Sequence, residues 1–208
     1  MNLIRTLLAI PLACAAIDCG GSSAAPSIAP PPLHGEAADA IGDTIAGGGV
    51  PIPPDLVHAT VDVASGNITF LIQLAPGTLD RQTTRVEILL DTDQSSSTGI
   101  RQLNGLGADY SIDLVASASQ TTVSRADAIG CAAFLSCYTS IGSAPIVFVQ
   151  DGMQTAIPLS LLGNDDGRLS FQVFSSAFVR ASPSSQAPLT AITFDAMPNE
   201  GAAPARVQ

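Results

Sequence analysis

The sequence predicts an all-β fold, an antiparallel β-sandwich of about eight strands that is jelly-roll-like in outline. Apolar and polar residues alternate in a series of short runs, and clusters of Gly, Asn, Asp, Ser or Pro separate these runs. No stretch shows the alternation of strands and helices that a parallel sheet requires. Hydrophobic residues make up 46% of the chain and charged residues 12%, which is enough apolar material for a core.

The first two strands are expected to form a hairpin. Residues 56–63 place four apolar side chains on one face, namely Val57, Ala59, Val61 and Val63. Residues 68–74 repeat this pattern with Ile68, Phe70, Ile72 and Leu74. The intervening sequence Ser65-Gly66-Asn67 has the composition of a tight turn.

Further runs continue the pattern along the chain. Residues 85–91 and 109–117 are expected to form a second hairpin, with these residues inward: Val86, Ile88, Leu90, Tyr110, Ile112 and Leu114. More short strands are expected within residues 120–127, 145–152, 168–178 and 189–197. Residues 153–167 differ, because Pro158 interrupts the run and PLSLLG is typical of a single helical turn before a polar loop.

The N-terminal residues are typical of an export signal. An apolar run follows Arg5, and it is too short to span a bilayer but matches the apolar region of a secretory signal peptide. We therefore expect a signal peptide over residues 1–19, a Gly/Ser/Ala/Pro linker over residues 20–37, the sandwich over residues 38–200 and a tail over residues 201–208. The mature protein is expected to be secreted or held at the cell envelope, with membrane contact only through a lipid anchor.

The signal has two possible ends. CGGSSAAPS, which begins at Cys19, resembles the start of bacterial lipoproteins, in which a lipidated Cys precedes a flexible tether. Asp18 is an unusual residue directly before such a Cys. Ala13-Cys14-Ala15 offers a site for ordinary signal peptidase instead.

Cysteine pairing favours Cys19 as the lipidated residue. Cys131 and Cys137 lie close together in the sequence and are expected to form a disulfide in an oxidising compartment. If Cys14 leaves with the signal peptide, Cys19 is unmatched, and lipidation accounts for it. Lipidation of Cys14 and simple cleavage without lipidation are the alternatives.

The charge of the chain excludes two classes of partner. All eight basic residues are Arg, and the formal net charge is −10. Nucleic acids and anionic membrane surfaces both require clustered positive charge, so neither is expected as a partner. Asp supplies 15 of the 18 acidic residues, which favours turns, caps and oxygen-rich ion sites over helix interiors.

The stretch LLDTDQSSSTG, residues 89–99, combines acids and hydroxyls in a way that suits an ion. Asp91 and Asp93 are two residues apart, so their carboxylates can point to the same side, and Ser95 continues the spacing. Calcium takes several oxygen ligands, and such a loop can surround it if Asp109 folds back beside it. Spacing alone favours the alternative, a solvated turn in which Asp side chains cap backbone amides.

Four motifs resemble a pattern found in bacterial extracellular β-sandwiches. In order, they are ADAIGDTIAGGG, DTDQSSSTG with GADYSIDL, AIPLSLLG, and FDAMPNEG. Over about residues 37–200, they resemble family 9 carbohydrate-binding modules and the related DOMON-like domains. The resemblance implies a structural calcium ion and shifts our interpretation of the loop towards a calcium site. Its candidate ligands in this chain are Asp91, Asp93 and Asp109, with Asp39 and Asp43 as further candidates.

The ligand chemistry of these families transfers poorly. Their sugar binders stack sugar rings on Trp, and this chain has no Trp. Tyr138 is available for stacking, although its place beside Cys137 also suits a cover for the disulfide. Some DOMON-like relatives bind haem through Met and His. No haem is expected here, because His58 lies beside a core face and Met153 is expected in a turn.

No catalytic site stands out in the sequence. The chain has two His residues, and GxSxG, HExxH and phosphate-binding motifs do not occur. Glu87 and Asp113 are expected singly on outward faces, and Asp165-Asp166 is expected in a turn. We therefore expect an exported, non-enzymatic module that binds a glycan or another protein at the cell envelope. The alternative is an accessory domain, hydrolase or redox protein of another type.

We predict that Cys19 tethers the mature protein to a membrane. Cys19→Ser should move the protein from the membrane fraction to the soluble fraction, because no other anchor is expected. Cell fractionation with immunodetection measures this, and Cys14→Ser is the matched control, which should leave the protein membrane-bound. Release by Cys14→Ser alone, or a wild-type protein that is already soluble, would contradict the prediction.

Overall fold

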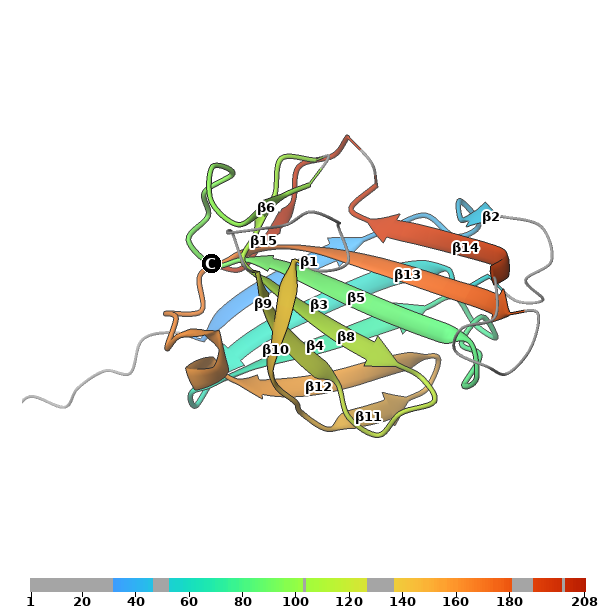
Figure 1. The fold of residues 1–208 in the computed structure, drawn as a ribbon, viewed down its shortest axis with the longest axis horizontal. Helices are drawn as coiled ribbons and strands as arrows, with labels where there is room; N and C mark the ends of the chain where they lie inside the picture. Colours follow the sequence, from blue (N-terminus) through green and yellow to red (C-terminus); the bar gives the residue numbers. More distant parts are fainter. Residues whose placement is uncertain (1–31, 47–52, 103, 127–136, 181–188, 200) are drawn as a thin grey trace, which may run out of the picture. The chain divides into compact units, whose positions relative to one another are not determined.

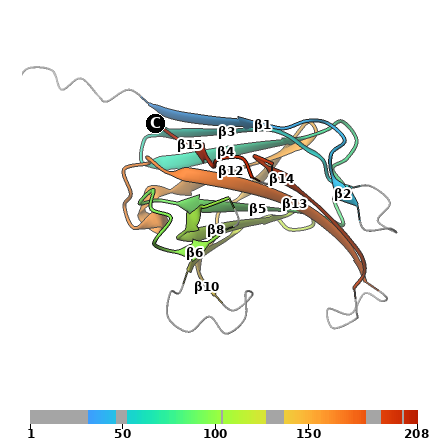
Figure 2. The same cartoon turned by 90° about the horizontal axis from the view of Figure 1, so that it is seen from above.

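Two antiparallel sheets pack face to face in the described part of the chain, which confirms the predicted β-sandwich (Figure 2). The structure is a computed structural model that describes residues 32–46, 53–102, 104–126, 137–180, 189–199 and 201–208. These residues lie within one unit, Pro32–Gln208, and contain no helix long and apolar enough to cross a bilayer. The expected signal peptide, with Cys14 and Cys19, lies outside the described residues.

The smaller sheet has five strands in the order β1-β3-β4-β12-β11 (Figure 1). Their bounds are β1 Leu33–Ala38, β3 Leu56–Ala64, β4 Asn67–Leu74, β11 Ile146–Val149 and β12 Gly152–Pro158. The first predicted hairpin corresponds to β3 and β4, which pair antiparallel. Its turn is made by Ser65 and Gly66, and both have the positive φ that a two-residue hairpin turn requires.

The larger sheet has eight strands, in the order β10-β9-β8-β5-β13-β14-β2 with β15 paired to the start of β13. Their bounds are β2 Ile45–Ala46, β5 Thr84–Asp91, β8 Tyr110–Val115, β9 Thr122–Ala126, β10 Tyr138–Gly142, β13 Ser170–Arg180, β14 Leu189–Met197 and β15 Ala205–Arg206. A separate short ladder joins β6 Ile100–Arg101 to β7 Gly107–Ala108. Figure 2 shows β13 and β14 curving away from the smaller sheet at one end. The prediction of about eight strands omitted the two-residue strands and also β1, β10 and β12.

The core lies between the sheets and uses the inward faces that the alternation predicts. The predicted inward residues of β4, β5 and β8 are all buried, namely Ile68, Phe70, Ile72, Leu74, Val86, Ile88, Leu90, Tyr110, Ile112 and Leu114. In β3, Ala59, Val61 and Val63 are buried as predicted. The start of β3 differs, because a bulge between Leu56 and His58 buries Leu56 and leaves Val57 half-buried.

The segment after β11 is a strand for longer than the sequence indicates. β12 ends at Pro158 and a 3₁₀ turn, η2 Leu159–Leu162, follows it, which confirms the predicted helical turn. The expectation that Met153 lies in a turn is wrong. Met153 is on β12, pairs with Ile72 and is 0% exposed. The turn lies just before it, at Asp151, whose φ is positive.

Both ends of the described unit extend beyond the expected domain bounds. β1 lies almost wholly within residues 20–37, which were expected to be linker. β15 lies within residues 201–208, which were expected to be a tail. The sandwich therefore begins before residue 38 and continues past residue 200.

The two ends escaped prediction because their packing requires small residues and short strands. The backbone of His34 exchanges two hydrogen bonds with that of Gln208, at 3.3 and 3.2 Å. Gly35 faces the last strand so closely that a Cβ there would meet Val207 Cγ2 at 2.9 Å. Because close packing requires Gly at position 35, the sequence of β1 resembles a flexible linker more than a strand.

We predict a disulfide between Cys131 and Cys137. Cys137 is 3% exposed and directly precedes β10, whereas Cys131 lies outside the described residues. The unreduced, exported protein should show the two residues linked by mass spectrometry. Removing both should lower the free energy of unfolding by about 2 kcal/mol, because the closed loop is short. Alkylation of both thiols without prior reduction would contradict the pairing.

Candidate functional site

The acidic loop between β5 and β8 brings together three predicted carboxylates. Asp91 ends β5, Asp93 lies in the following turn, and Asp109 separates β7 from β8. Each offers a carboxylate oxygen within 4.8 Å of the other two. The pairing of β5 with β8 causes this, because Asp109 N donates a hydrogen bond to Leu90 O at 2.7 Å, directly beside Asp91.

Backbone and hydroxyl donors orient these carboxylates. Ser95 N donates to Asp91 Oδ1 and to Asp93 Oδ1, each at 3.0 Å. Thr92 donates to Asp109 Oδ2 through both N and Oγ1, each at 3.0 Å. The predicted ligand Ser95 thus contacts the carboxylates through its amide, while its hydroxyl bonds a neighbouring serine. The solvated-turn alternative predicts bonds of this kind as well.

The loop folds back on itself at a glycine. A Cβ on Gly107 would overlap the carbonyl oxygens of Ser95 and Thr98, so a larger residue would push the loop open. Gly107 N lies 3.4 Å from Asp91 Oδ2 and donates to it. The absence of a side chain therefore lets the backbone reach the deepest carboxylate.

The three carboxylates fit a calcium ion by distance and by charge. Burial raises the pKa of the Asp91 carboxyl; hydrogen bonds from Ser95 and Gly107 oppose this rise, and Asp93 and Asp109 add to it. No salt bridge among the described residues neutralises them. Oxygens that share one calcium ion lie at most about 5 Å apart, because each is about 2.5 Å from the ion.

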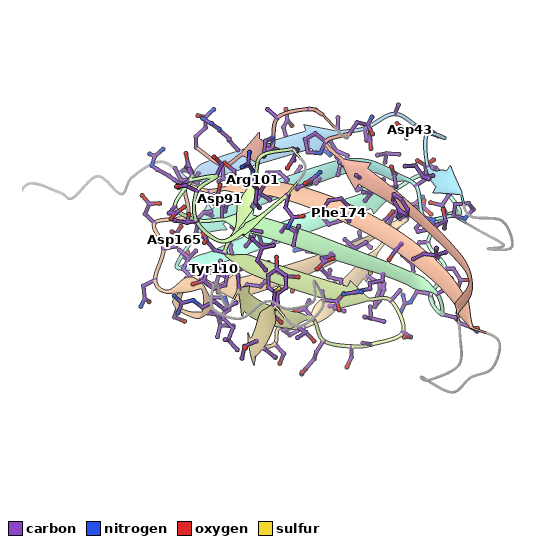
Figure 3. All side chains as sticks on the ribbon, turned by 45° about the horizontal axis from the view of Figure 1, so that its top comes forward. Asp43, Asp91, Arg101, Tyr110, Asp165 and Phe174 are labelled. Atoms are coloured by element: carbon purple, nitrogen blue, oxygen red, sulfur yellow. The ribbon has the colours of Figure 1, made fainter. Side chains whose placement is uncertain are left out.

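Asp39 and Asp43 do not lie at this loop. Their carboxylates gather with that of Asp195 on β14, each within 4.8 Å of the others. Asp91 pairs with β13 at residue 170 and Asp195 pairs with it at residue 175, five residues further along (175 − 170). Five residues of strand span about 17 Å, so one ion cannot serve both groups. Figure 3 shows Asp43 and Asp91 far apart.

Asp195 was missed because the alternation of β14 misleads: its apolar residues Ile192 and Phe194 are exposed, whereas the polar residues between and after them are buried. It occupies an inward position in β14, between Thr193 and Met197, and all three are buried. A buried carboxylate requires a polar contact. Here Asp195 Oδ2 accepts a hydrogen bond from Leu56 N at 2.8 Å. Burial raises the pKa of the Asp195 carboxyl, and it raises that of Asp39 to about 6.

A groove of about 610 Å³ lies on the outer face of the larger sheet. Its apolar surface comes from Leu89, Tyr138, Phe174 and Phe194, and Figure 3 shows Phe174 between Asp91 and Asp43. Its principal polar side chains are Arg85, Glu87, Asp113, Gln172, Gln102 and Asn104. A cavity of this size suits a small ligand or a short stretch of a polymer.

Three residues that line the groove each carry a buried polar atom that has no hydrogen-bond partner among the described residues. These atoms are Asn104 Nδ2, Tyr138 Oη and Gln172 Oε1. Gln172 is 3% exposed, and its Nε2 donates to Pro198 O at 3.4 Å. Burial, together with the nearby Glu87 and Asp109, raises the pKa of the Tyr138 hydroxyl. An unpaired donor, hydroxyl and acceptor therefore belong to residues that line the groove.

Glu87 and Asp113 were expected to stand singly on outward faces, and this expectation is half wrong. Both face outward, but β5 and β8 pair them directly opposite each other, at the groove. Asp113 Oδ1 accepts a hydrogen bond from Arg85 Nε at 2.6 Å. Glu87 Oε1 accepts one from Ser111 Oγ at 2.8 Å. Single-strand alternation gives the face of a residue but not its partner across the ladder.

The two residues considered for haem lie on different faces of the smaller sheet. Met153 is in the core, whereas His58 is on the outward face of β3 with its Nε2 3.7 Å from Glu36 Oε2. They do not face a common space. The turn expected at Asp165-Asp166 is present, and both side chains accept hydrogen bonds from amides two residues further on.

No protein-family model matches the chain, and no curated protein matches it. The resemblance to family 9 carbohydrate-binding modules and DOMON-like domains therefore rests on the sequence motifs and stays a prediction.

We predict that calcium stabilises the acidic loop. The protein should melt at a higher temperature in calcium than in chelator, because binding to the folded state adds about 2.7 kcal/mol at a hundredfold excess over Kd. Asp91→Asn and Asp93→Asn should each reduce this calcium-dependent increase. Asp166→Asn, in an exposed turn, is the matched control. Calorimetry or fluorescence melting measures the difference, and equal increases in all four proteins would leave the loop as a solvated turn.

Proposed function

We propose that the chain is an exported, lipid-anchored, non-enzymatic module that binds a glycan in the outer groove. The expected N-terminal signal and Cys19 support the location, and the groove supports the activity. The acidic loop, with calcium bound, would stabilise one wall of that groove.

The observation that carries the proposal is the set of partnerless polar atoms at the groove, on Asn104, Tyr138 and Gln172. A buried polar group without a partner costs about 1–3 kcal/mol, so such groups are rare unless water or a ligand satisfies them. Sugar hydroxyls both donate and accept hydrogen bonds, so they can satisfy a donor, an acceptor and a hydroxyl in one place.

The mixture of surfaces in the groove also suits a sugar. Phe174 and Phe194 come from the adjacent strands β13 and β14, and Tyr138 comes from β10. Aromatic rings provide flat apolar surfaces for the C–H faces of a sugar ring, and polar side chains beside them fix its orientation. These aromatic side chains supply apolar contact that Trp provides in the families the sequence resembles.

A protein partner fits the groove less well than a glycan. A stable protein interface buries about 800 Å² on each partner and is usually broad. The groove is instead a concave space of about 610 Å³ with buried polar atoms in its lining. Concave sites with a few placed polar groups are typical of small ligands.

The acidic loop and the groove share a segment of chain. Gln102 and Asn104 belong to the connection between β6 and β7 and line the groove. Gln102 N donates to Leu106 O at 2.8 Å, and buried Leu106 packs with Leu89 beneath the groove. Calcium bound at Asp91 would therefore hold the segment that presents Asn104.

A hydrolase is the second candidate, and the facing pair of Glu87 and Asp113 is the observation in its favour. Glycosidases use two carboxylates, one of which must donate a proton. Here Arg85 engages Asp113 and Ser111 engages Glu87, so both carboxylates already have partners. We therefore favour binding without cleavage.

We predict that soluble neutral oligosaccharides bind in the groove. Titration calorimetry with a panel of α- and β-linked hexasaccharides should identify one that binds. Phe174→Ala and Asn104→Ala should each weaken that binding by about tenfold, which corresponds to about 1.4 kcal/mol. The loss of ring contact explains the first effect, and the loss of a hydrogen bond explains the second.

Gln154→Ala, on β12 in the smaller sheet, is the matched control and should bind as the wild type does. Chromatography of the same mixtures tests the hydrolase alternative, because shortened oligosaccharides would show cleavage. A panel without any binder, or binding that neither groove variant weakens, would count against the glycan proposal.

A further inference from the structure

A second group of carboxylates lies where the edges of the two sheets approach each other. Asp39 follows β1, Asp43 precedes β2 and Asp195 is on β14, and an oxygen of each lies within 4.8 Å of the others. A fourth acid, Asp55, directly precedes β3. Burial is the main cause of the raised pKa values of Asp39 and Asp195, and the charge of the nearby Asp55 adds to both.

Hydrogen bonds to the start of β3 hold this group together. Asp39 N donates to Val57 O at 3.1 Å, which fixes the end of β1 beside β3. Gly42 N donates to Asp55 Oδ2 at 2.9 Å, which brings the turn before Asp43 to the same place. The amide that follows Asp55 donates to Asp195 Oδ2 at 2.8 Å, across the gap between the sheets.

Two oxygens of this group are buried without a hydrogen-bond partner among the described residues. One is Oδ1 of Asp55, a residue that is 5% exposed, and the other is Oδ2 of Asp39. Burial removes the water that would otherwise solvate a carboxylate, so an oxygen left in this state calls for an ion or a proton.

No basic side chain among the described residues forms a salt bridge with these carboxylates, which are those of Asp39, Asp43, Asp55 and Asp195. Carboxylates this close together repel one another in their ionised forms. One proton relieves one pair of them, whereas one divalent cation relieves all of them together.

We propose that Asp39, Asp43, Asp55 and Asp195 bind a divalent cation of the calcium class, at a site separate from the acidic loop. The donor set is entirely oxygen and anionic, which suits a hard cation rather than zinc or copper. Asp39, Asp43 and Asp195 have oxygens within 4.8 Å of one another, which agrees with ligands that share one ion, and Asp55 would join them as the fourth. The amides of Leu56 and Ala196 orient the Asp195 carboxylate and leave it further acceptor capacity.

This site would also shape the outer groove from the end opposite the acidic loop. Asp43 and Ile45 line the groove, and Ile45 pairs with Phe194 across β2 and β14. Asn199, another lining residue, donates from Nδ2 to Asp43 Oδ2 at 3.1 Å. A cation bound at Asp43 would therefore tie this wall to both sheets.

Titration calorimetry with calcium chloride on the full mature chain tests the proposal, without any glycan present. The wild type should bind calcium at this site, and Asp43→Asn should weaken that binding by about tenfold or more, because one anionic ligand is lost. Asp43 is exposed, so the variant should fold. Asp39→Asn should act in the same direction, and circular dichroism checks that each variant is folded.

Asp62→Asn is the matched control, because Asp62 is an exposed acid on the outward face of β3 that contacts His34. It should bind calcium as the wild type does. Asp91→Asn separates the two sites, because it disrupts the acidic loop alone. Calcium binding that persists in Asp91→Asn and weakens when Asp43→Asn is added supports the second site. This result does not depend on whether the acidic loop binds calcium. Absence of binding in Asp91→Asn at millimolar calcium, or equal binding with and without Asp43→Asn, would overturn the proposal.

Discussion

The antiparallel pairing of β5 with β13 is the constraint on which the core and the candidate sites both depend. Val86 and Ile88 face the core from β5, while Glu87 and Leu89 face the groove. β13 divides in the same way, with Phe174 on the groove side. A shift of one residue in this register would exchange the two faces, placing the glutamate in the core. The buried apolar surface therefore fixes the geometry of the groove.

Much of the fold follows from that alternation, and the rest depends on partners that a single strand does not reveal. Ile112 was assigned to the core because its neighbours in sequence, Ser111 and Asp113, are polar, and it is buried. Gly35 carries no such signal, since close packing against Val207 requires the smallest residue. The bulge at Leu56 was also hidden, because it arises from the pairing of β3 with β4.

The candidate sites also differ in whether the sequence could predict them. Asp91 and Asp93 could be grouped with Asp109 because one hairpin joins them, so their proximity follows from local order. Asp39 could not be grouped with Asp195, because 156 residues separate them (195 − 39) and only the assembled sheets bring them together. The groove could not be predicted for the same reason. Its lining comes from separate strands, and the sequence of one strand does not determine which strands lie beside it in the sheet.

The negative charge of the chain affects both carboxylate groups and the groove that lies between them. With a formal net charge of −10 and no Lys, the protein has few cationic side chains with which to neutralise clustered carboxylates. Both acidic groups lie beside segments that form walls of the groove, one presenting Asn104 and the other presenting Ile45. Repulsion within either group would oppose the hydrogen bonds that hold the loop and the short β2 in place. Ions from the surroundings would therefore act on the shape of the groove as well as on stability. In the proposed function, the acids would therefore shape the glycan groove without touching its ligand.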